Sequence, residues 1–258
     1  MCTVTVVPRS RLSSAAWAVD PLLLRLVSNR DEQRARADAL PPVLQAIEGR
    51  RVVAPLDPES GGTWIAVNDG GLVFALLNAN SAARPTADGL SRGGLIPQLA
   101  GAGSMSEALA RVLDARTERY RPFRLLMLDA SQLVECWVED GRLRYRRAYL
   151  HGPVMRTSSS LGDAVVEGPR RTLFRRFFRG SAQASAAQDA FHDHQWPGRE
   201  DVSVRMQRAD ACTVSRTVVE VSASYATMIY HAAQPELRAR VVLPLAGSTS
   251  LTGARRCS

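Results

Sequence analysis

The sequence predicts an α+β fold in which two mostly antiparallel sheets lie face to face, with a helical layer on either side. The predicted elements follow the order strands, helices, strands, helices, strands, which is typical of this class. A clear hairpin and a three-strand meander favour antiparallel pairing. No internal repeat, heptad or linker divides the 258 residues. We therefore expect one domain over residues 1–258, with roughly the last dozen residues frayed because they are rich in Ser, Gly and Arg.

The N-terminal part of the chain predicts paired strands. Residues 2–7 (CTVTVV) and 22–28 (LLLRLVS) are β-branched or apolar runs separated by a stretch that contains Ser, Ala and Pro. Residues 63–67 and 72–77 flank Asn-Asp-Gly-Gly at 68–71, where Asx and Gly supply the positive φ of a tight turn. These runs predict a two-stranded pair and a hairpin.

Helices and further strands follow the hairpin. Residues 91–101 predict a short helix, and the next helix opens with a Ser104 to Glu107 capping box before apolar residues at helical spacing. Strands are then predicted at 123–129, 132–140, 143–150 and 154–160, helices at 161–179 and 182–194, and late strands at 202–206, 212–221, 226–232 and 238–245.

Charge and composition exclude several classes of function. All 33 basic residues are Arg, so neither a Schiff-base lysine nor a phosphate-loop lysine is present. The net charge of +8 would suit nucleic acid, but Arg is spread along the chain near Asp and Glu, so we expect no nucleic-acid partner. Only residues 170–179 are densely basic. They predict an amphipathic helix with aromatics in the core and Arg at a solvated face or pocket rim; contact with a membrane surface or an acidic ligand is the alternative.

Cysteine and histidine spacing gives no metal site. The four cysteines form no CxxC pair, and His192 and His194 are poorly spaced for one helix face, so we interpret them as surface polar residues. The chain start shows no secretory signal and no segment is long enough to cross a membrane. We therefore expect a cytoplasmic protein without metal or cofactor; the sequence indicates no oligomeric state.

Two short stretches carry candidate chemistry. Cys2 is either a small apolar residue at the start of a strand or, after removal of Met1, a nucleophile whose own α-amine serves as its base. The run SNRDE at 28–32 places Asn29, Arg30, Asp31 and Glu32 at the end of a strand. A carboxylate there could hold an α-ammonium, and an Arg could lower a thiol pKa or bind a substrate carboxylate.

Read together, several motifs resemble the NRDE family, named for its Asn-Arg-Asp-Glu motif. They are MCT at 1–3, NRDE at 29–32, DPESGGTWIAVN at 57–68, LLN ending at 78, SRG at 91–93, SSS at 158–160 and ADACTVS at 209–215. The family is similar to N-terminal-nucleophile hydrolases, including choloylglycine hydrolases and penicillin V acylases. The resemblance implies a four-layer αββα sandwich.

The resemblance also implies roles for residues. Cys2 matches the nucleophile, Asp31 the acid that holds its α-amine, and Asn78 an oxyanion-hole donor. At the position of the acylases' Arg this chain has Ser28, so Arg30 would have to reach in from the side. The late acylase Arg would be Arg175 or Arg176.

Four further residues are candidate substrate contacts. Asn29 and Glu32 belong to the NRDE run, and Thr157 lies near a second acylase site residue that is normally Asn. Trp64 follows the glycine pair and is interpreted first as a packing residue and second as a ligand contact.

The implied function is cleavage of an amide C–N bond in a small, partly apolar, non-peptide substrate by an amidohydrolase or an acyltransferase, without a cofactor. The alternative is a non-catalytic protein on the same scaffold that binds haem or an acyl lipid, because a fold does not fix a function.

Overall fold

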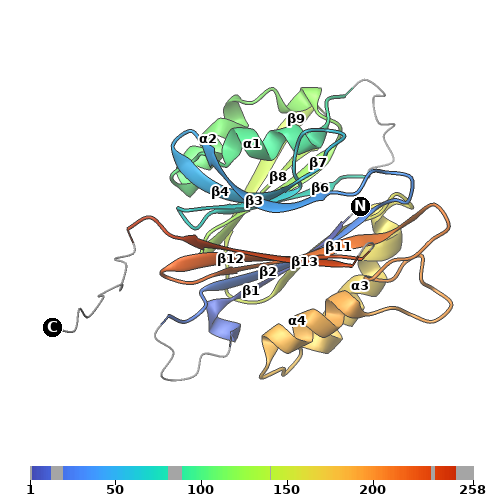
Figure 1. The fold of residues 1–258 in the computed structure, drawn as a ribbon. Coiled ribbons are helices and arrows are strands. Elements are labelled where there is room, and N and C mark those ends of the chain that lie inside the picture. Colours follow the sequence, from blue (N-terminus) through green and yellow to red (C-terminus); the bar gives the residue numbers. More distant parts are fainter. Residues whose placement is uncertain (1, 13–19, 81–88, 140, 234–235, 248–258) are drawn as a thin grey trace.

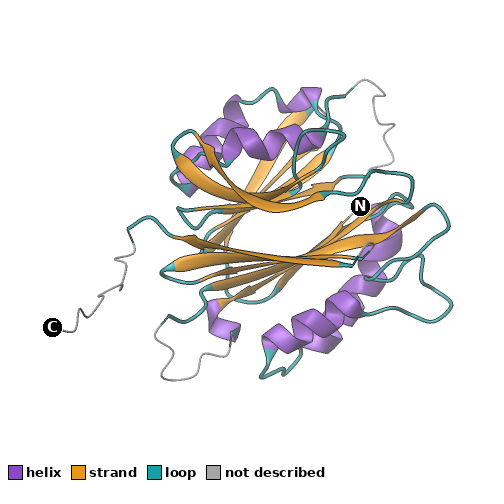
Figure 2. Cartoon of the chain, viewed as in Figure 1, coloured by secondary structure: helices purple, strands orange, loops and turns teal. Residues whose placement is uncertain are grey.

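The protein, a computed structural model, is a sandwich of four layers (Figure 1). Residues 2–12, 20–80, 89–139, 141–233 and 236–247 are described, so the expected fraying of the C-terminus falls outside them. Two antiparallel sheets pack face to face, helices α1 and α2 cover one outer surface, and α3 and α4 cover the other (Figures 1 and 2). The predicted α+β class and the αββα layering are confirmed.

Six strands form the sheet that carries the N-terminus. In spatial order they are β10 (Val154–Ser158), β1 (Cys2–Pro8), β2 (Leu24–Gln33), β11 (Ala211–Val221), β12 (Tyr225–Ala232) and β13 (Leu237–Pro244). The predicted pairing of the first two strands is confirmed, with Cys2 opposite Arg30 and Pro8 opposite Leu24.

The second sheet has seven strands in chain order. They are β3 (Leu40–Ile47), β4 (Arg50–Leu56), β5 (Ile65–Asn68), β6 (Val73–Asn78), β7 (Phe123–Leu128), β8 (Gln132–Glu139) and β9 (Arg142–Tyr149). The predicted hairpin and meander are both present. In the hairpin turn, Asn68 Oδ1 accepts from the backbone N–H of Gly70 at 3.0 Å and of Leu72 at 3.1 Å.

The helices are short and lie outside the sheets. They are α1 (Leu95–Leu99), α2 (Met105–Asp114), α3 (Asp163–Phe178) and α4 (Ala184–Asp193), with 3₁₀ turns η1 (Arg9–Arg11), η2 (Arg92–Gly94) and η3 (Thr117–Arg119). Ser104 caps α2 as predicted, since its Oγ accepts from Glu107 N at 3.2 Å. The Glu107 carboxylate reaches back to Gly103 N, at 2.7 Å, one residue before the expected partner.

Side-chain alternation in β1 and β2 separates two environments. Val4 and Leu26 point into the apolar core between the sheets. Residues one position along, such as Thr3 and Thr5, point to the opposite surface and face α3 and α4, because successive side chains of a strand alternate between faces. The central strands are therefore buried on both faces, and one face contacts a polar layer beneath the helices.

That polar layer corrects two expectations. Arg170 was expected at a solvated face or pocket rim, but it is only 1% exposed, while Arg175 and Arg176 are exposed as expected. His192, expected at the surface, is 1% exposed and its ring nitrogens contact Thr5 Oγ1 at 2.8 Å and Asn29 Oδ1 at 3.0 Å. Burial lowers the pKa of His192 well below its usual value, so the ring is neutral.

Two segments of the chain differ from the predicted secondary structure. No element was expected over 40–56, yet these residues form the β3–β4 hairpin, with Glu48 and Gly49 at φ 49° and 78° in its turn. Residues 202–206 were expected to be a strand and are not one, because the Val202 and Ser203 carbonyls accept hydrogen bonds from Arg170 instead of from a neighbouring strand.

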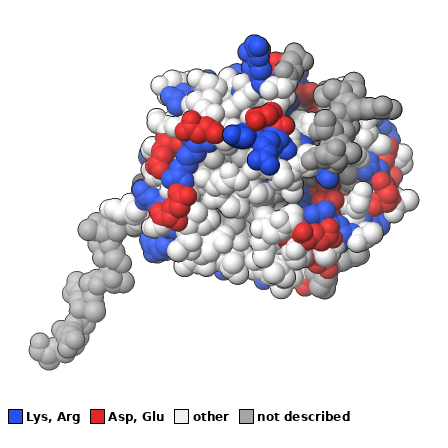
Figure 3. Space-filling model, turned by 90° about the horizontal axis from the view of Figure 1, so that it is seen from above, with Lys and Arg blue, Asp and Glu red and all other residues white. Residues whose placement is uncertain are grey.

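The surface has no large region of one charge in the view of Figure 3, where Arg and acidic side chains lie next to one another. The described helices include none that is both long and apolar enough to span a bilayer.

Arg170→Met tests the polar layer. Arg170 donates to Thr3 Oγ1 (2.9 Å), Thr157 Oγ1 (2.6 Å), Val202 O (3.0 Å) and Ser203 O (2.6 Å). The substitution removes this donor from the two buried carbonyls, whereas the two hydroxyls keep the hydrogen bond between them at 3.0 Å. We expect the free energy of unfolding, measured with urea, to fall by about 3 kcal/mol. Arg171→Met is the matched control: its side chain is 52% exposed and pairs with Glu167, so its loss should cost under about 0.5 kcal/mol. Equal effects of the two substitutions would contradict this account.

Candidate active site

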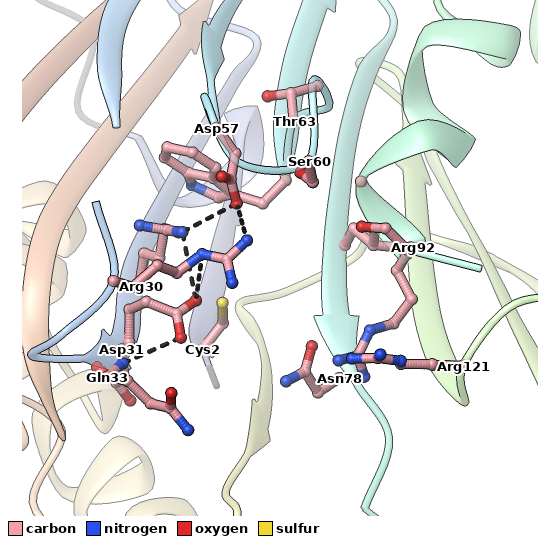
Figure 4. Close-up of a pocket in the computed structure, with 16 residues that line it drawn as sticks. Cys2, Arg30, Asp31, Gln33, Asp57, Ser60, Thr63, Asn78, Arg92 and Arg121 are labelled. Atoms are coloured by element: carbon pink, nitrogen blue, oxygen red, sulfur yellow. Dashed lines mark hydrogen bonds and ion pairs between the residues drawn. The ribbon is translucent and has the colours of Figure 1, made fainter. Parts of the chain in front are cut away.

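A cavity of about 340 Å³ opens between the two sheets at the end where β1 begins (Figure 4). Strand β2, strand β6 and the loops before β5, α1 and β7 contribute its walls. Most of the lining is charged or polar; it consists of Cys2, Arg30, Asp31, Glu32, Gln33, Arg36, Asp57, Ser60, Thr63, Trp64, Leu76, Asn78, Ser91, Arg92, Gly93 and Arg121.

Cys2 lies between two neighbouring strands. It faces Arg30 on β2 and Ser158 on β10, and its backbone nitrogen donates to Ser158 Oγ at 3.2 Å. Its side chain is 6% exposed and faces the space between the sheets, as Val4 does. The strand pairing therefore fixes the thiol at the cavity wall.

Burial raises the pKa of the Cys2 thiol. The negative charge of Asp31 raises it further, and the positive charge of Arg30 opposes both effects. A buried thiol in this position forms a thiolate only with the help of a base.

Arg30 occupies the cavity wall next to Cys2. Cross-strand neighbours place their Cβ atoms roughly 5 Å apart on the same face, so the two side chains lie side by side. The Arg30 guanidinium lies 4.5 Å from the centre of the Trp64 ring, and its Nη2 is 3.3 Å from Asp57 Oδ2 and 3.3 Å from Glu32 Oε2. Ser28, two residues earlier, faces Val4 and does not line the cavity, so Arg30 is the β2 arginine beside the thiol.

Asp57 joins two arginines. Arg36 Nη2 lies 2.8 Å from Asp57 Oδ2, and Arg36 also contacts Glu59 at 3.2 Å. Burial acts to raise the pKa of Asp57, but the hydrogen bond from Arg36 and the charges of Arg36 and Arg30 outweigh it and hold that pKa below its usual value. Asp57 is therefore ionised at neutral pH and keeps both guanidinium groups in place.

Asp31 follows Arg30 on β2, one residue beyond the last residue of β2 that pairs with β1. Its Oδ1 accepts from Thr213 Oγ1 at 2.6 Å, beside an irregularity in the β2–β11 pairing. Burial raises the pKa of Asp31, and the charge of Arg170, on the helix-facing side of the sheet, lowers it. Asp31 thus lies close enough to Cys2 for its charge to act on the thiol, and the charge of the buried Arg170 acts on Asp31 in turn.

The opposite wall carries Asn78, Arg92 and Arg121 (Figure 4). Asn78 is the last residue of β6, and Arg92 begins η2 and donates from Nη1 to the Pro122 carbonyl at 3.0 Å. Burial lowers the pKa of Arg92, and the like charge of Arg121 lowers it further.

Close backbone packing against Gly62 and Thr63 holds the turn that carries Arg92 at the cavity. Thr63 N donates to the Gly93 carbonyl at 3.0 Å, and a Cβ on Gly62 would lie 2.2 Å from the Gly93 carbonyl carbon. Only glycine permits this approach.

The structure brings together six of the eight candidate residues. Cys2, Arg30, Asp31, Glu32, Trp64 and Asn78 line the cavity. Asn29 and Thr157 do not, because they point to the helix-facing surface: Asn29 Nδ2 donates to the His192 and Val204 carbonyls at 2.8 and 3.1 Å, and Thr157 contacts Thr3 and Arg170.

Sequence reasoning missed three arginines and left one without a role. Arg36 and Arg121 line the cavity and Arg170 lies behind Asp31, whereas Arg175 and Arg176 do not line it. Arg92 was noticed only as part of the SRG motif. The spacing of Arg36 four residues after Glu32 was the one local signal, and the two side chains do approach to 3.7 Å.

Gly62→Ala tests how the two loops are held. The added methyl would collide with the Gly93 backbone, so we expect the free energy of unfolding to fall by about 2 kcal/mol, measured by urea denaturation. Gly94→Ala is the control, since Gly94 has φ −73° and nothing lies within 4 Å of an added Cβ. A Gly62→Ala variant as stable as Gly94→Ala would show that the loops do not depend on this contact.

Solved structures with the same fold are named as hydrolytic enzymes. Penicillin V acylase from Agrobacterium tumefaciens has 14% identity and a TM-score of 0.51, with 93% of this chain and 86% of that chain covered. An N-acylethanolamine-hydrolyzing acid amidase ortholog from Caenorhabditis elegans has 13% identity and a TM-score of 0.54, with 84% and 92% covered. A mutant conjugated bile acid hydrolase from Clostridium perfringens has 9% identity and a TM-score of 0.51, with 95% and 97% covered. The fold is therefore that of the N-terminal-nucleophile hydrolases, as the resemblance implied.

A search of curated proteins gave no match. The sequence profile of the family described as Transport and Golgi organisation 2 matches residues 15–193, which is more than half of the chain. The chain therefore belongs to the Transport and Golgi organisation 2 family.

Proposed function

We propose that the protein is an N-terminal cysteine hydrolase that cleaves the C–N bond of a small non-peptide amide after removal of Met1. The observation that carries the proposal is the position of Cys2 in the wall of a polar cavity, with Arg30 beside it and Asn78 in the opposite wall. The structural neighbours, named as an acylase, an amidase and a hydrolase, support such chemistry on this scaffold. Their identities of 14% or less carry no substrate over to this chain.

The first half of the reaction forms an acyl-enzyme. The α-amine of Cys2 takes the proton of its own thiol, and the thiolate attacks the amide carbonyl carbon. Negative charge develops on the carbonyl oxygen, where the Asn78 side-chain N–H stabilises it. The C–N bond then breaks, the leaving nitrogen takes the proton from the α-ammonium, and a thioester remains on Cys2.

The second half releases the acid. Water attacks the thioester carbonyl while the α-amine accepts a proton from it, the C–S bond breaks, and the thiol is restored. Asp31 holds the α-ammonium in the charged states of this cycle, and Arg30 stabilises the thiolate. Neither step needs a redox partner.

The cavity lining favours a polar substrate over the partly apolar one that the resemblance implied. Trp64 and Leu76 supply its main apolar surface, and charged and polar side chains supply most of the rest. The same lining disfavours the alternative of haem or acyl-lipid binding, because a macrocycle or an acyl chain is recognised mainly by apolar surface.

Variants of the two central residues test the proposal. With a panel of N-acyl amides as substrates, Cys2→Ala should abolish turnover, and Asn78→Ala should lower kcat by roughly 10²- to 10³-fold because an oxyanion-hole donor is lost. Cys212→Ala, which changes a thiol that does not line this cavity, should keep full activity. Intact mass spectrometry should show that the active protein lacks Met1. Turnover by Cys2→Ala, or by a chain that retains Met1, would refute the mechanism.

A further inference from the structure

We infer that the substrate carries an oxyanion group, a carboxylate or a phosphate, and that Arg92 and Arg121 bind it. This inference rests on the proposed function and adds to it the chemical class of the substrate. It concerns the wall of the cavity that lies opposite Arg30 and Asp57.

The four arginines of the cavity fall into two groups. Arg30 and Arg36 each pair with carboxylates: both contact Asp57 and Glu32. The ion pairs found in the described part of the chain include neither Arg92 nor Arg121. One wall is therefore electrically balanced, and the other presents cations to the cavity.

Arg92 and Arg121, which form no ion pair with a described residue, lie close together. Figure 4 shows the side chains of Arg92 and Arg121 on the same wall, next to Asn78. Their mutual repulsion contributes to the lowered pKa of Arg92. An oxyanion between two guanidinium groups removes this repulsion and accepts charge-assisted hydrogen bonds from both, a geometry for which guanidinium is suited.

The position of Arg92 is fixed before any ligand arrives. Its Nη1 donates to the Pro122 carbonyl, and the Gly62–Gly93 backbone contact holds the turn that carries it. The side chain is half-buried, so part of the cost of desolvating and ordering it is met in the folded protein. Arg92 is thus preorganised for a ligand, and the exposed Arg121 lies beside it on the same wall.

The geometry links anion binding to the chemistry at Cys2. Arg92 is near enough for the charge of Cys2 to act on it, and Asn78 lies on the same side as the two arginines (Figure 4). A cavity of about 340 Å³ holds one small molecule. A substrate anchored by its anion at Arg92 and Arg121 therefore places another part of itself at the thiol, and the anchor selects which amides are positioned for attack.

Binding to Cys2→Ala tests the inference without requiring turnover. Three ligands that differ in one group would be compared by titration calorimetry: N-butanoylglycine, N-butanoylglycinamide and N-butanoyl-aminomethylphosphonate. At least one of the two anions should bind about tenfold or more tightly than the neutral amide, and the stronger one identifies carboxylate or phosphate as the natural group. Arg92→Gln and Arg121→Gln, each in the Cys2→Ala background, should each weaken that anion about tenfold and leave the amide unchanged. Arg142→Gln, on the exposed edge strand β9, is the control and should change nothing.

The outcomes separate this inference from the proposed function. Equal affinities for the anions and the amide, no measurable binding of either anion, or anion binding that survives loss of both arginines would overturn it. Cys2-dependent turnover of neutral and anionic amides with equal kcat/KM would also overturn it while leaving the hydrolase intact. Tight, arginine-dependent anion binding in a protein that turns over none of these amides would support the anion site and count against the hydrolase.

Discussion

Arg30 connects the two sheets at the point where the cavity opens. It belongs to β2 of the six-stranded sheet, yet its guanidinium is held by Asp57 and lies against Trp64, both of which precede β5 of the other sheet. Arg30 is also the cross-strand neighbour of Cys2. Its contacts with Asp57 and Trp64 therefore set the position of the loop before β5 relative to the thiol. A charged side chain between two sheets is stable here only because carboxylates and an aromatic face replace the lost water. The remaining features of the site depend on this arrangement.

Charge is distributed in layers around Cys2. On the helix-facing side the buried cation of Arg170 lies near Asp31, and on the cavity side Arg30 and Arg36 share Asp57 and Glu32. The thiol between them has a raised pKa because it is buried, so the field of the site alone does not ionise it. This is the setting in which a base on the same residue matters most, since a proton can move within Cys2 without bringing solvent into the cavity.

The local secondary-structure elements were largely predictable from the sequence. The surface of the sheet to which each side chain points was not. Strand runs, the 68–71 turn and the Ser104 cap follow from residue type over a few positions. Asn29 and Arg30 are adjacent, however, and point to opposite surfaces, a choice set by the register of β1 against β2 and therefore by distant pairing. The burial of Arg170 depends on Thr3, 167 residues away in the chain. Strand β3 contains Pro41 and Pro42, which argue against a strand unless the strand lies at the edge of a sheet, and β3 is an edge strand. The family motifs indicated the cavity because they combine residues that are distant in the sequence and line one cavity in the fold.

The central claim, that Cys2 is a nucleophile, is tested most directly by the mass of the protein after brief incubation with N-acyl amides and acid quenching. The account predicts a chain without Met1 that carries one added acyl group, with peptide mapping assigning the group to Cys2 and Asn78→Ala slowing its appearance. An acyl group found on Cys136 or Cys212 instead, or a Cys2→Ala protein acylated as fast as the parent, would contradict it.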